Sequence, residues 1–237
     1  MTKIPLRSVS QLNQYTRCPM SYKLDRIDKV WRRPAAWLPQ GSAFHTVAET
    51  YEKALAEGRE MTLEKAQEIF AEEYSKDIGR LCEETPNFEW WSHSGQYGGE
   101  RDIERRWKIG QEQVEKFITW RQTKGQEIWV TPERIGPDGL RRDPKPAIEL
   151  SFSVLLMAPG KSPIRVRGFI DAVVVVNGEL RVRDYKTGNQ PGDDFQLGVY
   201  AQAVALMFGI EAPKTGDYFM ACKKGKKPVV TAPYDLT

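Results

Sequence analysis

Residues 167–188 read R-G-F-I-D-A-V-V-V-V-N-G-E-L-R-V-R-D-Y-K-T-G, and this stretch decides the fold. Two runs rich in β-branched residues flank Asn177-Gly178, the dipeptide most typical of a two-residue hairpin turn. Such a turn fixes the register of the two strands, and that register sets Asp171 directly opposite Asp184. We therefore predict a β-hairpin that holds two carboxylates side by side.

Lys186 shares a face with both acids, because opposed residues and residues two apart in a strand project the same way. The rest of that face is apolar and belongs to the core: Val173, Val175, Leu180 and Val182. Two carboxylates beside an apolar surface repel each other, so such a pair shares a proton or binds a cation. Oxygen ligands suit Mg²⁺ or Mn²⁺, and Lys186 could then hold an attacking water or offset charge on a phosphate. The alternative is a structural ion cluster in which Lys186 bridges two acids.

Composition and charge exclude several classes of protein. The chain has 237 residues, of which 40% are hydrophobic and 28% are charged, so it can bury a core and is not disordered. The net charge is only +3, but residues 1–40 carry eight basic and two acidic side chains, whereas residues 41–120 carry ten and seventeen. This segregation indicates one side that faces a polyanion. No apolar run could span a membrane and no signal peptide begins the chain, so we expect a cytoplasmic protein without membrane contact.

Hydrophobic periodicity and turn residues predict helices first and a sheet afterwards. Helices are expected over 8–27, 41–55, from Thr62 onward, over 100–123 and from Asp193 or Asp194 to 208, with loops over 28–40 and 86–99. Strands are expected over 127–132, 147–157, 164–176, 179–185, 217–222 and 228–232. The prediction is an α/β fold in a single domain over 1–237, with a mainly helical part over 1–125 and a sheet-rich part over 126–237.

The motifs Gly168-Phe-Ile-Asp171 and Asp184-Tyr-Lys186-Thr-Gly, joined by a hairpin, resemble the core of the PD-(D/E)xK nuclease superfamily. More narrowly they resemble its RecB-like exonuclease branch, which includes CRISPR-associated and phage RecB-like exonucleases. Three further matches follow the order of that branch and extend the resemblance over residues 8–200: Ser8-x-Ser10 with Cys18-Pro19, Gly41-x-x-x-His45, and Gln196-x-x-x-Tyr200.

The resemblance implies a restriction-endonuclease-like core, with a central mixed sheet flanked by helices, and metal-dependent hydrolysis of DNA. The residues that would bind one or two Mg²⁺ or Mn²⁺ ions are His45, Asp171, Asp184 and the backbone carbonyl of Tyr185. Lys186 would be catalytic together with the two acids, and Gln196 and Tyr200 would contact DNA. The branch favours an exonuclease that acts on single-stranded or free-ended DNA in recombination, repair or phage DNA processing, inside a bacterial or phage-infected cell.

Two other functions remain open at this point. The chain could be a catalytically silent nucleic-acid-binding module with the nuclease fold, although the complete set of two acids and a lysine argues against it. It could also be a restriction-type double-strand endonuclease, against which the Gln196-x-x-x-Tyr200 motif argues. Gln196 and Tyr200 could equally be ordinary residues of a buried helix.

Several residues outside these motifs have two readings. Cys18, Cys82 and Cys222 are too few for an iron–sulfur cluster, which takes four thiolates, so none is expected. Glu149 could have an outer-shell role or be a solvated edge acid, and Glu49 could orient His45 or lie on the surface. His93 is expected at the surface. Trp90-Trp91 could stack on bases, but packing within a loop is the more common role of such residues. The basic turn Lys223–Lys227 could contact phosphates or be solvated.

Overall fold

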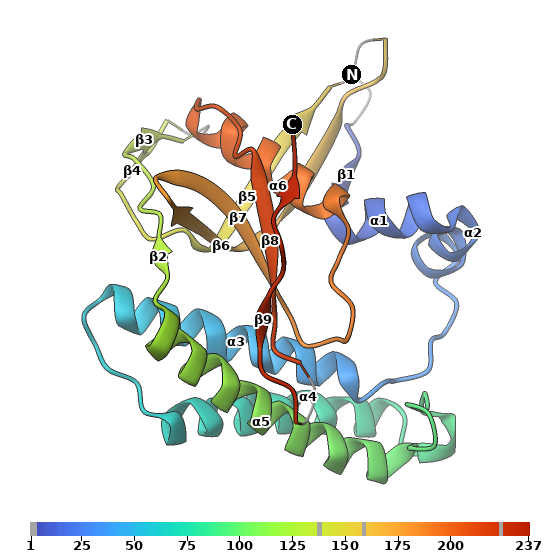
Figure 1. The fold of residues 1–237 in the computed structure, drawn as a ribbon. Coiled ribbons are helices and arrows are strands. Elements are labelled where there is room, and N and C mark those ends of the chain that lie inside the picture. Colours follow the sequence, from blue (N-terminus) through green and yellow to red (C-terminus); the bar gives the residue numbers. More distant parts are fainter. Residues whose placement is uncertain (1–3, 137–138, 158–159, 223–224) are drawn as a thin grey trace.

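The computed structural model describes residues 4–136, 139–157, 160–222 and 225–237 (Figure 1). The helices in this part of the chain are α1 (Val9–Arg17), α2 (Pro19–Tyr22), α3 (Trp37–Ala56), α4 (Leu63–Glu84), α5 (Gly99–Lys124) and α6 (Asp194–Phe208), with a π-helical turn over Lys23–Ile27 and a 3₁₀ turn over Phe88–Trp90. The strands are β1 (Leu6–Ser8), β2 (Glu127–Ile128), β3 (Arg134–Ile135), β4 (Arg141–Arg142), β5 (Ile148–Leu156), β6 (Ile164–Val176), β7 (Glu179–Lys186), β8 (Thr215–Met220), β9 (Val229–Val230) and β10 (Tyr234–Asp235).

Among the described residues, eight strands form one mixed sheet, and β3 and β4 form a separate two-stranded ribbon. The order along the sheet is β1-β6-β7-β8-β10, while β2 and β5 also pair with β6 and β9 pairs with β8. The pairs β1–β6 and β7–β8 are parallel and the other pairs are antiparallel. The predicted α/β fold, a central mixed sheet flanked by helices, is confirmed.

The hairpin of β6 and β7 has the predicted register. Pairing runs from Val176↔Glu179 next to the turn to Ala172↔Arg183, and both turn residues, Asn177 and Gly178, have positive φ angles of 54° and 81°. Asn-Gly favours the turn in which both central residues have positive φ, because Asn and Gly adopt positive φ with little strain. The turn chemistry therefore sets the register that brings the segments carrying Asp171 and Asp184 next to each other.

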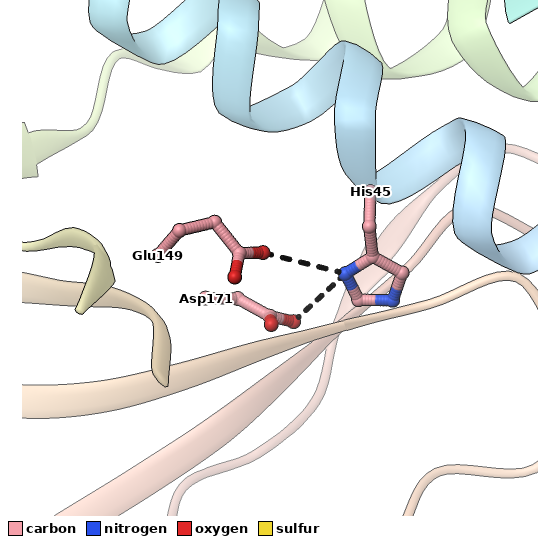
Figure 2. A group of neighbouring side chains, drawn as sticks. All are labelled: His45, Glu149 and Asp171. Carbon is pink, nitrogen blue, oxygen red and sulfur yellow. Dashed lines mark ion pairs between the residues drawn. The ribbon is translucent and has the colours of Figure 1, made fainter. Parts of the chain in front are cut away.

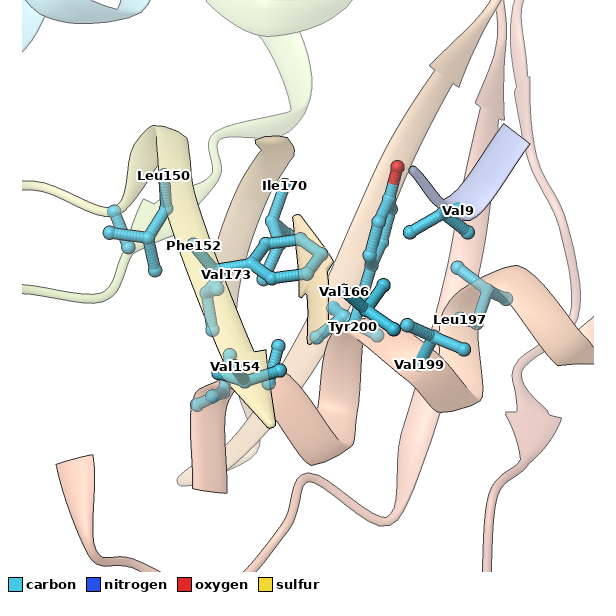
Figure 3. Close-up of a cluster of buried hydrophobic side chains, with 14 of the residues drawn as sticks. Val9, Leu150, Phe152, Val154, Val166, Ile170, Val173, Leu197, Val199 and Tyr200 are labelled. Atoms are coloured by element: carbon cyan, nitrogen blue, oxygen red, sulfur yellow. The ribbon is translucent and has the colours of Figure 1, made fainter. Parts of the chain in front are cut away.

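Apolar side chains cover the two faces of the sheet with different helices. On one face α6 packs on β5, β7 and β8, and β6 and Val9 of α1 contribute to the same cluster (Figure 3). On the other face, residues of α3, α4 and α5 surround Phe117 and meet Val174 and Tyr185 of the hairpin. Figure 1 shows these three helices together on one side of the fold, away from α6. The hairpin thus lies between two cores, and its open end is held from both faces.

The structure corrects two predicted helix boundaries. The helix expected over 8–27 is broken at Cys18, because a residue before proline is pushed out of the helical region, and Pro19 then starts α2. Ser8 caps the first piece, and its side chain accepts the backbone N–H of Gln11. Residues 28–40 are not all loop: α3 begins at Trp37, and its first turn contains Pro39, where no intrahelical N–H is needed.

Two further differences concern strands. The N-terminal part contributes β1, which runs parallel to β6 and was not expected, so residues 6–8 belong to the sheet. The strand expected over 127–132 is only two residues long in β2. Three or fewer paired residues leave almost no alternation of polar and apolar side chains, which is why such short strands escape a pattern-based prediction.

A buried ion pair joins β7 to β8. Asp217 is fully buried, and its carboxylate receives Arg183 Nε at 2.6 Å and a second guanidinium nitrogen at 2.8 Å. The two residues are register partners, so this pair lies across the parallel ladder. A bidentate contact of this kind satisfies both buried charges and fixes the position of β8 beside the strand that carries Asp184 and Lys186.

We expect opposite effects from alanine at two helical glycines. A Cβ at Gly110 of α5 would lie 1.9 Å from the ring of Phe70 on α4, whereas a Cβ at Gly79 of α4 would meet nothing within 4 Å. Gly110→Ala should therefore lower the free energy of unfolding by about 1–3 kcal/mol. Gly79→Ala, the matched control, should raise it by up to about 1 kcal/mol through helix propensity alone. Urea unfolding measures both, and equal effects of the two variants would contradict the close contact of α4 and α5.

None of the helices in the described ranges combines the length and the apolar composition that crossing a bilayer requires.

Candidate metal centre

Asp171 lies where the ladder between β6 and β7 ends. The last register pair is Ala172↔Arg183, and at the next position the Asp171 side chain takes part in the pairing: its Oδ2 accepts the backbone N–H of Tyr185 at 2.6 Å. A side chain thus replaces the carbonyl of a regular ladder, which separates the two strands here. The two predicted acids, Asp171 and Asp184, are consequently neighbours across an opening between β6 and β7.

His45 reaches Asp171 from α3. Its Nδ1 atom is 3.4 Å from Asp171 Oδ2 and 4.0 Å from Glu149 Oε1. One ligand atom from each of these three residues lies within 4.8 Å of the other two (Figure 2). Figure 2 shows the imidazole pointing from the helix toward two carboxylates that come from neighbouring strands. The two consecutive strands β5 and β6 and the distant helix α3 therefore bring an imidazole nitrogen and two carboxylates together.

Glu149 is the residue of this cluster whose position the sequence did not reveal. Its neighbours pair as Ile148↔Ala172 and Leu150↔Ile170, so the same register sets Glu149 opposite Asp171. Its φ angle is +42°, which is rare for a residue other than glycine and usually needs a local reason. The available signal was an acid at the start of an apolar strand, and that signal could not show which residue of the next strand would face it.

Asp184 belongs to a second set of contacts, shared with α6. Lys186 Nζ lies 2.6 Å from Asp184 Oδ2, and Gln196 Nε2 donates to Asp184 Oδ1 at 2.7 Å. The same nitrogen donates to the hydroxyl of Tyr200 at 2.8 Å, and Lys186 Nζ is 3.4 Å from Gln196 Oε1. The one-turn spacing of Gln196 and Tyr200 puts both on the face of α6 that meets β7. The contact of Gln196 with Asp184 ties the helix to the acidic strand, and Tyr200 contacts the same amide.

The cluster contains more carboxylates than cationic groups, so negative charge is in excess. Burial raises the pKa of Asp184, and the charge of Asp171 raises it further. Burial likewise raises the pKa of Glu149 to about 7. Burial lowers the pKa of His45, but the nearby acids outweigh it and raise that pKa to about 9. Burial and neighbouring negative charge thus disfavour the charged forms of Glu149 and Asp184, while the same acids favour the charged form of His45.

The donor set fits a divalent cation. Carboxylate oxygens with one imidazole nitrogen are ligands that Mg²⁺ or Mn²⁺ accepts, and a doubly charged ion would relieve the repulsion that raises the pKa values of the acids. Asp184 Oδ2 is buried and accepts no hydrogen bond from any described residue, although the Lys186 ammonium is close to it. The residues whose ligand atoms converge and could hold the ion are His45, Glu149 and Asp171, while Asp184 stays a predicted ligand.

Contacts from α5 and the segment that follows it hold the end of β7. Gln113 Nε2 donates to the carbonyl of Thr187 at 2.9 Å, and Gln126 Nε2 donates to the hydroxyl of Tyr185 at 3.0 Å. The Tyr185 ring is buried on the face opposite Asp184, while its backbone N–H serves Asp171. The side chain thus anchors the strand on one face, and the backbone holds the acid. A role of the Tyr185 carbonyl as a ligand stays a prediction.

Other residues that the sequence singled out lie away from this cluster. Glu49 pairs with Lys53 on the surface of α3, so this contact does not orient His45. Trp91 is buried and donates to the carbonyl of Thr85, whereas Trp90 is exposed and contacts the ring of Trp31 edge to face. Of the three cysteines, which are all free, Cys18 is exposed. Lys223 and Lys224 of the basic turn lie outside the described residues.

Comparison with known proteins agrees with this geometry. A family model described as PD-(D/E)XK nuclease superfamily matches residues 7–235. The chain is 73% identical over 245 residues to the Gene 69 protein of Mycobacterium phage L5, which covers 100% of this chain and 83% of that protein. It is 65% identical over 235 residues to the Gene 69 protein of Mycobacterium phage D29, covering 99% and 82%. The match extends over the acids of the hairpin, the lysine two residues beyond, and both flanking helices, and the chain belongs to the PD-(D/E)XK nuclease superfamily.

Proposed function

We propose that the chain is a divalent-metal-dependent DNA exonuclease that hydrolyses phosphodiester bonds. The observation that carries the proposal is the convergence of His45, Glu149 and Asp171 beside the Asp184–Lys186 pair. An ion cluster that served only stability would pair each acid with a cation. Here three acids share one lysine and one histidine, and the pKa values of Glu149 and Asp184 are raised. An arrangement that is electrostatically incomplete on its own is what a metal-binding site requires.

We propose that His45, Glu149, Asp171 and Asp184 bind one or two Mg²⁺ or Mn²⁺ ions, with the carbonyl of Tyr185 as a further ligand. A bound divalent ion would polarise the phosphodiester and lower the pKa of a water molecule near it. The protein residues supply the geometry. The backbone N–H of Tyr185 orients Asp171, and the amide of Gln196 orients Asp184, so both carboxylates are fixed before a metal or substrate arrives.

Lys186 is the proposed catalytic lysine. Its ammonium lies between Asp184 and Gln196, and it borders a cavity of about 750 Å³ that is also lined by Gln196 and Tyr200. A phosphodiester in this cavity would lie within reach of the lysine. Lys186 can orient the attacking water or neutralise charge that develops on the phosphoryl oxygens. Gln196 and Tyr200 line the same wall of the cavity, and we propose that both contact DNA there. Gln196 at the same time donates to Asp184 and to the Tyr200 hydroxyl.

The proposed substrate is single-stranded or free-ended DNA, and the proposed process is recombination, repair or phage DNA processing. Support comes from the Gln196-x-x-x-Tyr200 motif and from the phage origin of the two relatives. We propose that residues 1–237 act as one nuclease domain, because β1 and α1 from the N-terminal part join the sheet and the core of the C-terminal part. A bacterial cytoplasm would be the site of action.

Digestion of labelled oligonucleotides tests the proposal. With Mn²⁺ present, 5′- and 3′-labelled single strands should lose nucleotides progressively from one end, and closed circular plasmid should stay intact. Cutting of the closed plasmid into discrete fragments would instead identify a restriction-type endonuclease. Binding of DNA without cleavage in Mg²⁺, Mn²⁺ or Co²⁺ would identify a silent binding module. The two labels also reveal the direction of digestion.

A further inference from the structure

The part of β6 that leads to Asp171 has one bare face. Val166 and Ile170 are buried in the core under α6, whereas Arg165, Arg167 and Phe169, which alternate with them, are exposed. Phe169 exposes 58% of its surface although it lies in the middle of a strand that pairs on both sides of this segment. A large aromatic side chain at such a position buries little in the folded chain, so folding alone does not explain it.

The neighbouring strand extends this bare face. The register pairs Ser151 with Phe169, Ser153 with Arg167 and Leu155 with Arg165, and all three β5 residues are exposed. We call the surface made by these six residues the open sheet face: Ser151, Ser153, Leu155, Arg165, Arg167 and Phe169. It contains two guanidinium groups, one exposed aromatic ring, two hydroxyls and no acid. Its composition therefore matches a ligand that has phosphates and flat apolar rings.

The open sheet face leads directly to the candidate metal centre. Asp171 follows Phe169 by two residues on β6, and Glu149 precedes Ser151 by two residues on β5, which is roughly 7 Å along each strand. The cavity that borders Lys186 and Gln196 also reaches this surface, where Arg167 and Phe169 line it together with Arg17 of α1. Arg167 and Phe169 thus belong both to the open sheet face and to the wall of the cavity that Lys186 borders.

The charges of this surface are available to a ligand. Within the described residues, neither Arg165 nor Arg167 forms an ion pair, and the same holds for Arg17 at the cavity wall. Most other arginines of the described chain are paired, as Arg183 is with Asp217. An unpaired guanidinium beside a hydrolytic centre favours a polyanion, since each phosphate contact releases counterions from the nucleic acid.

We propose that the open sheet face binds a segment of single-stranded DNA and leads it into the metal centre, which deepens the proposed function and rests on it. Phe169 stacks on a base, and Arg165 and Arg167 contact the phosphates on either side of it. A single strand is favoured over a duplex because stacking on a protein ring needs a base whose face is free, and in a duplex neighbouring bases cover both faces. The contacts do not read sequence, since they involve ring faces and phosphates.

Fluorescence anisotropy with a fluorescein-labelled thymidine 20-mer tests this surface, in EDTA so that no hydrolysis occurs. Phe169→Ala should weaken binding by about 10-fold or more, the loss of one stacked base, and Phe169→Tyr should restore it. Arg167→Ala should weaken binding and reduce the slope of log affinity against log salt by about 0.7. Arg101→Ala, an exposed arginine on α5, is the matched control and should bind as the wild type does.

Each outcome decides for or against the surface. Wild-type affinity in both Phe169→Ala and Arg167→Ala, in variants that melt at the wild-type temperature, overturns the proposal. Equal affinity of the wild type for a 20-base-pair duplex and for the single strand overturns the choice of ligand. Equal losses in Arg101→Ala and Arg167→Ala would show general charge attraction and would also overturn it. If the wild type binds through these residues but cleaves nothing in Mn²⁺, the surface is supported while the proposed nuclease function fails.

Discussion

Replacing Lys186 by alanine should lower the rate of Mn²⁺-dependent DNA hydrolysis by about 10²- to 10⁴-fold, the contribution of a positioned acid–base group. Lys186 Nζ lies 2.6 Å from Asp184 Oδ2 and borders the cavity through which a phosphodiester would enter. The variant removes the group that faces the reacting atoms but none of the proposed metal ligands. We therefore expect the rate under single-turnover conditions to fall while Mn²⁺ binding persists.

Stability must be separated from catalysis in this experiment. Without the ammonium, the buried Asp184 has one positive neighbour fewer, so some loss of stability in the metal-free protein is expected. Mn²⁺ should compensate for it. Lys65→Ala is the matched control, because Lys65 is an exposed lysine on α4 that pairs only with nearby glutamate. Wild-type rates in folded Lys186→Ala protein would exclude the assigned role of the lysine.

Asp171→Asn should weaken Mn²⁺ binding by about 100-fold or more. Outer-shell partners of metal ligands already contribute 10- to 100-fold, and Asp171 is the acid that contacts His45 and lies next to both other carboxylates. Asparagine keeps the shape and can still accept the N–H of Tyr185, so the strand should keep its position. Isothermal titration calorimetry with Mn²⁺ measures the change in affinity directly.

The thermal stability of the same variant gives an independent readout. In EDTA, Asp171→Asn removes one of the mutually repelling charges that raise the pKa of Asp184, so the melting temperature should not fall. With Mn²⁺, the wild type should gain melting temperature, because an ion that binds only the folded state stabilises it, and the variant should gain little. Asp77→Asn on the surface of α4 is the control. An equal gain for wild type and Asp171→Asn would place the ion elsewhere.

The sequence predicted the hairpin well because its determinants are local. Asn177-Gly178 selects one turn, one turn selects one register, and that register alone brings Asp171 beside Asp184. The bounds of β6 were also correct, since thirteen residues with a clear pattern end at the turn and at Pro163. The order of the family motifs predicted the other site residues. In the structure His45 approaches Asp171, and Gln196 contacts both Asp184 and Tyr200.

What the sequence did not reveal depends on contacts between distant segments. Glu149 joins His45 because β5 pairs with β6 in a register that no tight turn dictates, and its φ of +42° has no local signal. The strand β1 is three residues long, and only its parallel pairing with Arg165–Arg167 makes it a strand. The two tryptophans of Trp90-Trp91 differ in burial because one of them reaches the carbonyl of Thr85. Each of these facts belongs to tertiary packing.

A metal ion held by His45, Glu149, Asp171 and Asp184 is central to the proposed function, and its removal is the decisive experiment. An end-labelled single-stranded oligonucleotide is incubated with the wild-type protein in Mn²⁺ and, in parallel, in excess EDTA. The account predicts stepwise shortening of the oligonucleotide with Mn²⁺ and none with EDTA, with activity restored when Mn²⁺ is added back. Shortening that continues at the same rate in EDTA, or no hydrolysis with any divalent ion, would contradict it.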